Sequence, residues 1–333
     1  MQAAAETLET RAGPAAPPWT APAPALFPPG AQPRRAGVGE TRAHHGEIVQ
    51  GLFYSAEGTL EHGLVTLPCP LFGSRAVFRP LGAGPLTVHP ADRTRARAAA
   101  RLTLDALGRT GWGGALRVES DVPLRWGCGS STTDVLAAIR AVADAFDAPL
   151  PPAWIARIAV AAETASDSLM YGPERAVLFA QRRGSVLLDL GGPLPAVRVL
   201  GVNTERGRGV ETLALPPIPY SAWEIEAFGP MLGVLRRAVE RQDPALLGRV
   251  ATASTLITQR HRPKRCMPQL LRIARRTGAL GVQVAHSGTV AGLLFHPAAA
   301  ADAVARARAA LRRLGLRSWE FSTGAAAEPG GAP

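Results

Sequence analysis

The sequence predicts an α+β protein built in two parts, and three observations carry this prediction. Apolar residues recur with helical spacing from Val135 to Phe146, which is typical of a helix with one buried face. The stretch 115–120 alternates apolar and polar residues, as a half-buried strand does. The proline-rich stretch 215–219 marks a boundary, after which helices are mixed with an antiparallel sheet.

Hydrophobic patterning gives the elements of the first part in order. Strands are predicted at 46–53, 63–67, 74–78 and 115–120, and helices at 92–110, after residue 130 and at 153–162. A hairpin is predicted next, with strands at 185–190 and 197–203. Its turn would be Gly191-Gly192-Pro193, because glycine and proline favour tight turns.

The same patterning gives the second part. Helices are predicted at 223–241, 244–259, 267–277 and 298–313, and strands at 282–285, 290–295 and 316–321. The two domains are expected at 39–214 and 215–325. Residues 1–38 are rich in Ala and Pro and lack a hydrophobic period, so they are expected to be a flexible tail, and so are residues 326–333.

The chain has a formal net charge of +11, which raises the possibility of a nucleic-acid binder. Its arginines are scattered, however, and only 5% of the residues are aromatic, so the stacking surface of such a binder is missing. No apolar run is long enough to cross a membrane, and no secretory signal opens the chain. We expect a cytoplasmic monomer or homodimer that acts on a small molecule, with no nucleic-acid or membrane partner.

Cysteine and lysine are scarce. The three cysteines, Cys69, Cys128 and Cys266, form no CxxC pair, so a disulfide framework or a cysteine-based zinc site is not expected. His44 and His45 are adjacent, which is a poor arrangement for one metal ion, and the sequence offers no third ligand. Lys264 is the only lysine, so any mechanism that needs one must use it.

A glycine-rich turn precedes the helix that ends near Phe146. Gly127 and Gly129 permit positive φ and a close approach of backbone N–H groups to a ligand. Ser131 and Asp134 have the spacing of a capping box. A helix N-terminus with adjacent hydroxyls suits a polyphosphate and its magnesium ion. The alternative is a capped helix after a tight turn, with no ligand, and no lysine follows as in a Walker A loop.

At this point the chain resembles the GHMP kinase superfamily, whose phosphate loop has the form P-x-x-x-G-L-G-S-S-A. Residues 123–132 read PLRWGCGSST, with Cys128 and Thr132 in place of Leu and Ala. Two further segments resemble the L-threonine kinases within that superfamily. Residues 45–51, HGEIVQG, are similar to C-G-E-L-x-Q-G, and residues 284–293, VAHSGTVAGL, are similar to A-H-S-G-T-x-x-G-L.

The resemblance implies a two-domain fold, with an N-terminal ATP-binding domain like domain 2 of ribosomal protein S5 and a ferredoxin-like C-terminal domain. It also implies ATP and Mg²⁺ as cofactors. The residues expected to hold the ATP phosphates are Pro123, Gly127, Cys128, Gly129, Ser130, Ser131 and Thr132. Ser131 is expected to act in catalysis as well and to lie near the metal ion.

Two acidic residues follow the helix at 153–162. The resemblance implies that Glu163 binds the metal, although its spacing to the next motif is one residue longer than expected. Asp167, in a segment like the T-D-S of threonine kinases with Ser166 in place of Thr, is expected to act as the base or to orient the acceptor hydroxyl. The alternative is a solvated acidic pair at a helix end.

A second set of residues is expected to face the acceptor substrate. It comprises Glu47, Gln50, Asp167, His286, Ser287, Gly288 and Thr289. Glu47 would pair with a substrate ammonium group, or else serve as a turn carboxylate. Arg260 and His261 would supply positive charge to an acceptor carboxylate.

The resemblance implies an ATP-dependent kinase that phosphorylates a hydroxyl group, with L-threonine or a related hydroxy amino acid as the favoured acceptor, as in cobalamin or propanediol metabolism. One alternative is a GHMP kinase for another alcohol, such as homoserine or a biosynthetic intermediate. Another is a catalytically inactive member that binds a ligand and regulates.

Overall fold

Two long antiparallel strands organise the fold. The structure is a computed structural model that describes residues 35–210 and 215–324. Strand β1 (Gly37–Tyr54) pairs with β2 (Leu60–Ala83) along most of their length, with irregularities in register near His44. The predicted strands at 63–67 and 74–78 are therefore parts of one strand, β2.

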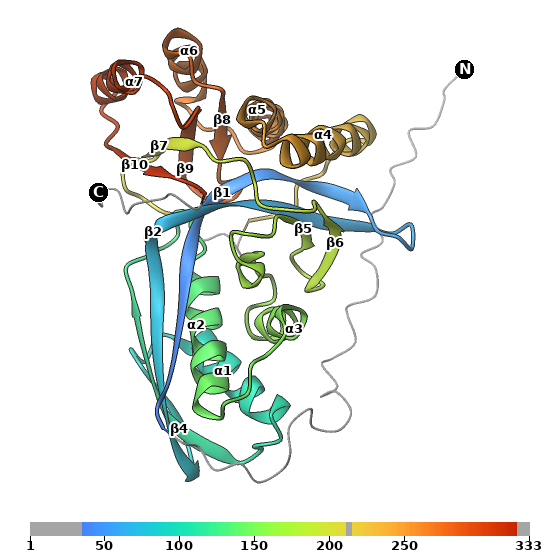
Figure 1. Ribbon diagram of the computed structural model, residues 1–333, viewed down its shortest axis with the longest axis vertical. Coiled ribbons are helices and arrows are strands. Elements are labelled where there is room, and N and C mark those ends of the chain that lie inside the picture. Colours follow the sequence, from blue (N-terminus) through green and yellow to red (C-terminus); the bar gives the residue numbers. More distant parts are fainter. Residues whose placement is uncertain (1–34, 211–214, 325–333) are drawn as a thin grey trace.

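The lower halves of β1 and β2 form a layered N-terminal unit (Figure 1). Strand β4 (Trp112–Ser120) pairs with β2, and β3 (Leu86–His89) pairs with β4. The helices α1 (Thr94–Ala106), α2 (Ser130–Ala145) and α3 (Pro152–Glu163) pack on one side of this sheet. Helix α2 lies directly on β1, because a Cβ atom at Gly39 would come within 2.2 Å of the Ala137 carbonyl oxygen.

A short hairpin extends the upper halves of β1 and β2. It consists of β5 (Val177–Ala180) and β6 (Ser185–Asp189), and it follows the single-turn 3₁₀ helix η1 (Leu169–Tyr171). β5 also pairs with β2 at Gly63 and Leu64. The predicted hairpin between 185–190 and 197–203 is therefore wrong: β6 pairs with β5, which the sequence analysis did not identify, and β7 (Arg198–Asn203) pairs with two strands of the other unit.

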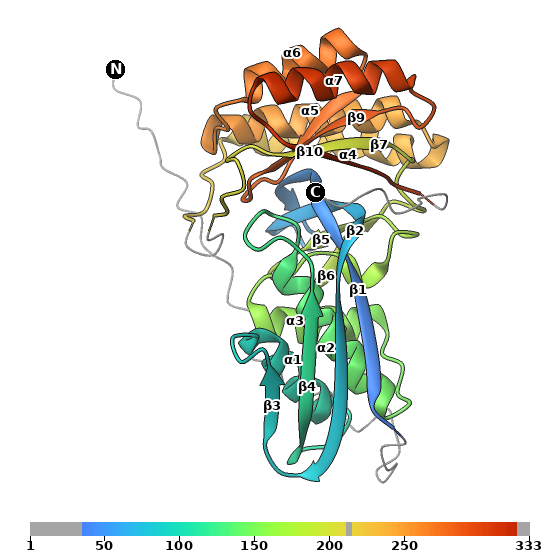
Figure 2. The ribbon, with the colours of Figure 1, turned by 90° about the vertical axis from the view of Figure 1, so that its left-hand side faces the viewer.

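The C-terminal unit is a four-stranded antiparallel sheet covered by helices (Figure 2). Its strand order is β10-β7-β9-β8, with β8 (Gly281–Val284), β9 (Val290–Phe295) and β10 (Ser318–Ser322). The helices are α4 (Ala222–Arg241), α5 (Pro244–His261), α6 (Met267–Thr277) and α7 (Ala301–Arg313). A single pair, Glu47 with Val284, joins β8 to β1, so the two units meet at the middle of β1.

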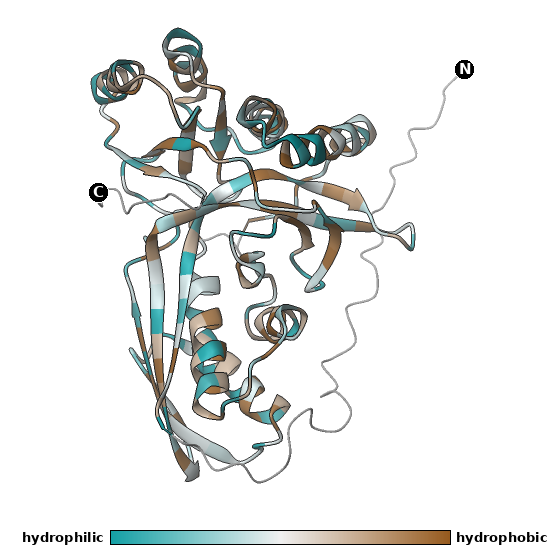
Figure 3. Ribbon diagram, viewed as in Figure 1, coloured by the Kyte–Doolittle hydropathy of each residue, from teal (hydrophilic) through white to brown (hydrophobic). Residues whose placement is uncertain are grey.

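The α+β prediction is confirmed, and each predicted helix is present with bounds shifted by a few residues. The chain enters the C-terminal sheet at β7, before the predicted boundary at 214/215. β1 begins at Gly37, inside the predicted tail, and Arg35, also within it, pairs with Asp144 at 2.8 Å. Residues 1–34 of that tail and the tail at 326–333 lie outside the described residues. Polar and apolar residues are mixed along the helices (Figure 3), and no helix among the described residues is long and apolar enough to span a membrane.

Candidate active site

The glycine-rich turn leads directly into α2. Gly127 and Gly129 have φ values of +85° and +75°, as the sequence analysis predicted for glycines at this turn. A Cβ atom at Gly129 would lie 2.5 Å from His44 Cδ2, so the turn leaves no room for a side chain there. Gly129 is also the N-cap of α2, and the first amides of a helix have no partner within it.

The predicted capping box is wrong. The Ser131 hydroxyl does not cap α2 but donates to Glu163 Oε2 at 2.6 Å. The Asp134 carboxylate accepts from Ser74 Oγ at 2.6 Å and pairs with Arg93 at 3.4 Å. Tertiary partners thus take both side chains away from the local motif, and Ser131 is held next to a carboxylate.

Backbone hydrogen bonds join the three sequence motifs. His44 N and Gly46 N donate to the carbonyl oxygens of Cys128 and Gly127, at 3.3 and 3.2 Å. Thr289 N and Val290 N both donate to the Trp126 carbonyl oxygen, at 2.8 and 3.1 Å. The glycine-rich turn is therefore clamped between the segment at 44–47 and the loop between β8 and β9.

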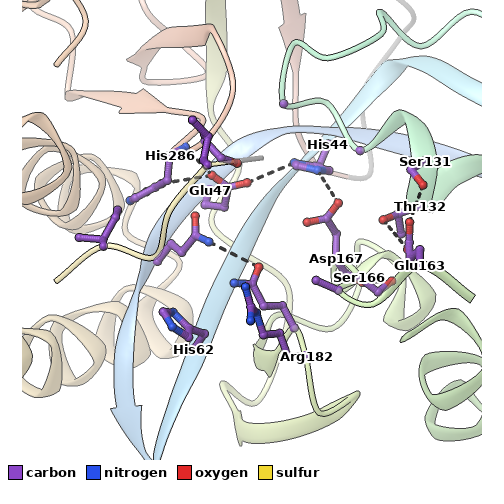
Figure 4. A pocket seen from close by; sticks show the side chains of 18 of the residues that line it. His44, Glu47, His62, Ser131, Thr132, Glu163, Ser166, Asp167, Arg182 and His286 are labelled. Atoms are coloured by element: carbon purple, nitrogen blue, oxygen red, sulfur yellow. Dashed lines mark hydrogen bonds and ion pairs between the residues drawn. The ribbon is translucent and has the colours of Figure 1, made fainter. Parts of the chain in front are cut away.

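A cavity of about 220 Å³ opens over this junction (Figure 4). The predicted site residues that line it are Glu47, Gln50, Gly127, Gly129, Ser130, Ser131, Thr132, Glu163, Asp167, His286 and Ser287. Pro123, Cys128, Gly288 and Thr289 are not among its lining residues. Cys128 points into the core, and Thr289 is buried against Asn203. Gly288 packs on the turn, where a Cβ atom would lie 2.3 Å from the Trp126 carbonyl oxygen.

His44 holds Asp167 at the centre of the cavity. His44 Nε2 lies 3.0 Å from Asp167 Oδ2, and Nδ1 lies 3.1 Å from the Gly46 carbonyl oxygen, so the ring donates to both as an imidazolium. Burial alone would lower the pKa of His44, but the Asp167 and Glu47 carboxylates outweigh it and raise that pKa to about 9. Burial would raise the pKa of Asp167, but His44 lowers it overall, so this carboxyl stays ionised.

The sequence analysis missed this role of His44, because the two partners lie 123 residues apart. It considered His44 only as a metal ligand and found no third one. The structure brings potential ligand atoms of His44, Glu47 and Asp167 within 4.8 Å of one another. Both ring nitrogens of His44 are engaged as donors, however, so this cluster is an ion pair beside a carboxylate and not a cation site.

The His44–Asp167 pair makes stability depend on pH. The folded-state pKa of His44, about 9, lies above its ordinary value of 6.5, so folding binds this proton more tightly. Its contribution to stability is complete below pH 6.5 and is lost as the pH rises through about 9. We expect the free energy of unfolding of the wild type, from urea titrations, to fall more steeply between pH 7 and 10 than that of His44→Gln. Parallel curves would contradict the ion pair.

Glu163 ends α3 inside the protein. The chain turns at Thr164, which has a φ of +73°, and Glu163 is only 4% exposed. Its carboxylate accepts from Ser131 Oγ at 2.6 Å and from Thr132 Oγ1 at 2.9 Å. Burial raises the pKa of Glu163 to about 7, and no cation pairs with it among the described residues. The alternative of a solvated acidic pair at 163 and 167 is therefore wrong.

Glu47 and Gln50, both on β1, form one wall of the cavity. Glu47 Oε2 accepts from the backbone N and from Nδ1 of His286, at 2.9 and 3.1 Å, and Ser254 Oγ lies 3.0 Å from the other ring nitrogen of His286. Gln50 Nε2 donates to Gln181 Oε1 at 3.5 Å, and Gln50 Oε1 is a buried acceptor with no partner in the described structure.

Two expected cations are directed elsewhere. Arg260 and His261 both pair with the buried carboxylate of Glu224, at 3.4 and 3.0 Å, and Arg260 also lies over the Trp223 ring. The expectation that they face an acceptor carboxylate is wrong. The Arg260 guanidinium neutralises the Glu224 carboxylate, which caps α4.

Lys264 supports the loop between β8 and β9 from behind. It is buried, and its Nζ atom donates to the Gly288 carbonyl oxygen at 2.8 Å. Burial lowers its pKa to about 8. Lys264 does not line the cavity, so the only lysine of the chain acts on the backbone of this loop and not in the cavity.

Comparison with known families gives two matches along the chain. Residues 94–173 match the model of the GHMP kinases N terminal domain, and residues 235–313 match the GHMP kinases C terminal model. The first match contains the glycine-rich turn and both acidic residues at 163 and 167. The second covers most of the helical layer of the C-terminal unit.

Two curated relatives are similar over much of their length. An L-threonine kinase from Salmonella typhimurium is 25% identical over 264 residues, which cover 78% of this chain and 82% of that protein. An L-threonine kinase from Citrobacter freundii is 29% identical over 185 residues, which cover 54% of this chain and 61% of that protein.

Solved structures share the fold at low sequence identity. A homoserine kinase from Cytophaga hutchinsonii has a TM-score of 0.63 and 15% identity, with 90% of this chain and 97% of that chain covered. A mevalonate kinase of L. major in complex with R-mevalonate has a TM-score of 0.61 and 17% identity, covering 90% and 100% of the two chains.

The chain belongs to the GHMP kinase superfamily and is a phosphotransferase that acts on an alcohol group.

Proposed function

We propose that this protein is an ATP-dependent kinase that transfers the γ-phosphoryl group to the hydroxyl of L-threonine. The observation that carries the proposal is the position of Asp167, which lies in one cavity between the glycine-rich turn and the wall formed by Glu47 and Gln50. The similarity to proteins named L-threonine kinase supports the choice of acceptor.

The turn at 127–132 would hold the triphosphate. The first amides of α2 and the hydroxyls of Ser130 and Ser131 border the cavity, where they suit phosphate oxygens. Arg95, an exposed residue of α1, reaches the same place and donates to Ser131 Oγ at 3.1 Å. A helix N-terminus and a guanidinium together would offset the charge of the triphosphate.

The oxygen atoms beside the turn fit a magnesium ion. Ser131 Oγ and the Glu163 carboxylate are hard ligands of the kind Mg²⁺ prefers, and within residues 35–210 and 215–324 no cation pairs with the buried Glu163 carboxylate. When bound, the ion would neutralise phosphate charge. The two residues would hold it, and the carboxylate would remain ionised in its presence.

Asp167 would orient the acceptor hydroxyl and take up its proton. Because His44 lowers the pKa of Asp167, the carboxylate is a weak base before the reaction begins. Phosphoryl transfer has a loose transition state in which the hydroxyl need not be deprotonated early. The proton would pass to Asp167 as the new O–P bond forms and the bond to ADP breaks. His44 fixes the carboxylate in one orientation during this step.

Glu47 and Gln50 would receive the substrate ammonium group. Gln50 Oε1 is a buried acceptor that has no partner in the part of the chain that the structure describes. Oε1 of Glu47 has His44 Nδ1 at 4.0 Å, and the other oxygen of Glu47 is bound to His286. A substrate ammonium group carries three donors and would satisfy these oxygens. This wall therefore favours an amino acid over a neutral alcohol.

A panel of acceptors tests the proposed function. ADP release is followed with Mg-ATP and L-threonine, L-serine, L-homoserine, mevalonate or glycerol as acceptor. We expect L-threonine to give the highest kcat/KM, with O-phospho-L-threonine as the product. A higher kcat/KM for homoserine or mevalonate would make that compound the acceptor in place of L-threonine. ATP binding without turnover of any alcohol would favour a catalytically inactive regulator.

A further inference from the structure

Two arginines and a histidine lie on one side of the cavity. His62, Arg182 and Arg262 all line it, together with Asp167. In the described parts of the chain neither Arg182 nor Arg262 forms an ion pair. Their sequence neighbours do: Arg183 pairs with Glu57 and Glu61, and Arg260 pairs with Glu224.

Backbone hydrogen bonds fix two of these residues relative to Asp167. Gln181 N donates to the His62 carbonyl oxygen at 3.2 Å, and Ser166 N donates to the Gln181 carbonyl oxygen at 2.9 Å. The turn between β5 and β6 is thus joined on one side to β2 and on the other to the Asp167 segment. Arg182, the next residue along this turn, is therefore connected through Gln181 to the segment that carries Asp167 and lines the same cavity.

Arg262 approaches from the C-terminal unit. It is the C-cap of α5, where its N–H donates to the Thr258 carbonyl oxygen at 2.8 Å. One guanidinium nitrogen donates to the Pro216 carbonyl oxygen at 2.7 Å, which leaves its other N–H groups for a ligand. The two arginines thus come from different units and meet at one cavity.

The electrostatics of this group favour an anion. Burial lowers the pKa of His62, and the charges of Arg182 and Arg262 lower it further. The two guanidinium groups have no ion-pair partner among the described residues and repel one another, and an anion between them would relieve that repulsion. In Figure 4 His62 and Arg182 lie below Asp167, away from Ser131 and Thr132. The triphosphate is expected at the turn that carries Ser131 and Thr132, so the anion bound by the two arginines would be a different one.

We propose that Arg182 and Arg262, assisted by His62, bind the carboxylate of the acceptor substrate and set its specificity. This inference rests on the proposed kinase function and assigns the residues that recognise the carboxylate of its acceptor. The guanidinium groups match a carboxylate through paired N–H donors. Glu47 and Gln50 would bind the ammonium group of an amino acid, and the two arginines would bind its carboxylate. Asp167 would hold its hydroxyl.

The test compares acceptor pairs that differ only in the carboxylate. L-Threonine is compared with L-threoninol, and L-homoserine with 2-amino-1,4-butanediol, in the wild type, Arg182→Ala and Arg262→Ala. The matched controls are Arg183→Ala and Arg260→Ala, which remove neighbouring arginines that are paired elsewhere. D-Glycerate and glycerol 3-phosphate distinguish a carboxylate from a phosphate as the bound anion.

We expect Arg182→Ala and Arg262→Ala each to raise KM for L-threonine about 10- to 100-fold, with little change in KM for ATP. A loss of this size is typical when a charged hydrogen-bonding partner is removed. The wild-type preference for threonine over threoninol should shrink by the same factor in these variants and remain in both controls. A merely structural role would change the two acceptors equally and leave this preference intact.

Three outcomes would overturn the carboxylate site. The first is a wild type that uses threoninol and threonine equally well, and the second is variants that keep the wild-type preference for threonine. The third is glycerol 3-phosphate as a better acceptor than glycerate in the wild type, with this preference lost in both variants, which would make the bound anion a phosphate. If only the proposed acceptor is wrong, the result differs. The wild type then does not use L-threonine but uses another hydroxy acid, and both variants lose the preference for that acid over its analogue without the carboxylate.

Discussion

The Asp167→Asn variant is expected to lose about 10²–10⁴-fold in kcat, the range typical of a residue that takes a proton from the reacting group. The amide keeps the volume of the carboxylate and can still accept from His44 Nε2, which lies 3.0 Å from Oδ2 in the wild type. It can no longer take up the hydroxyl proton. Initial rates at saturating ATP and acceptor measure the loss.

Two comparisons separate chemistry from folding in that variant. ATP binding, measured by calorimetry, should be unchanged, because Asp167 lies outside the turn at 127–132. Asp189→Asn, which removes an exposed carboxylate paired with Arg175, should keep wild-type turnover. Wild-type kcat in Asp167→Asn would remove Asp167 from the mechanism.

The second large effect is expected at the metal site. Glu163→Gln keeps the shape of the side chain and can still accept from one of the two hydroxyls, Ser131 or Thr132, but removes the charge. We expect KM for Mg-ATP to rise by about 10- to 100-fold, the loss typical of a group that supports a bound metal. Ser131→Ala should act in the same direction, since its hydroxyl and the Glu163 carboxylate are 2.6 Å apart.

Because Ser131 and Glu163 act on one ion, their effects should not add. The double variant should raise KM for Mg-ATP by less than the product of the two single changes. Glu119→Gln, which removes an exposed carboxylate on β4, is the matched control and should leave KM for Mg-ATP as in the wild type. Full additivity, or an unchanged KM in Glu163→Gln, would contradict a shared metal site.

Local patterns predicted much of the fold. Helix α2 was predicted because its apolar positions repeat every three or four residues, and Gly127 and Gly129 were predicted to have positive φ because the turn before it needs it. The missed strand β5 is only four residues long and buried throughout, so it shows no alternation. Without β5, Ser185–Asp189 was assigned to the wrong partner.

The site was predicted where it depends on short motifs and missed where it depends on distant contacts. Ser131 has the local spacing of a capping box, yet a glutamate 32 residues away takes its hydroxyl. His44 carries no local sign of its partner Asp167. Arg182 and Arg262 are separated by the whole of β7 and the helices α4 and α5, and nothing in the sequence near either arginine indicates that they share a cavity with Asp167.

The central claim is that the turn at 127–132 holds the triphosphate of ATP and directs it at an alcohol oriented by Asp167. A crystal structure with Mg²⁺, a non-hydrolysable ATP analogue and L-threonine tests it most directly. The account predicts the triphosphate against this turn, the metal at Ser131 and Glu163, and the acceptor hydroxyl beside Asp167. Triphosphate density away from the turn, or an acceptor hydroxyl out of reach of Asp167, would contradict it.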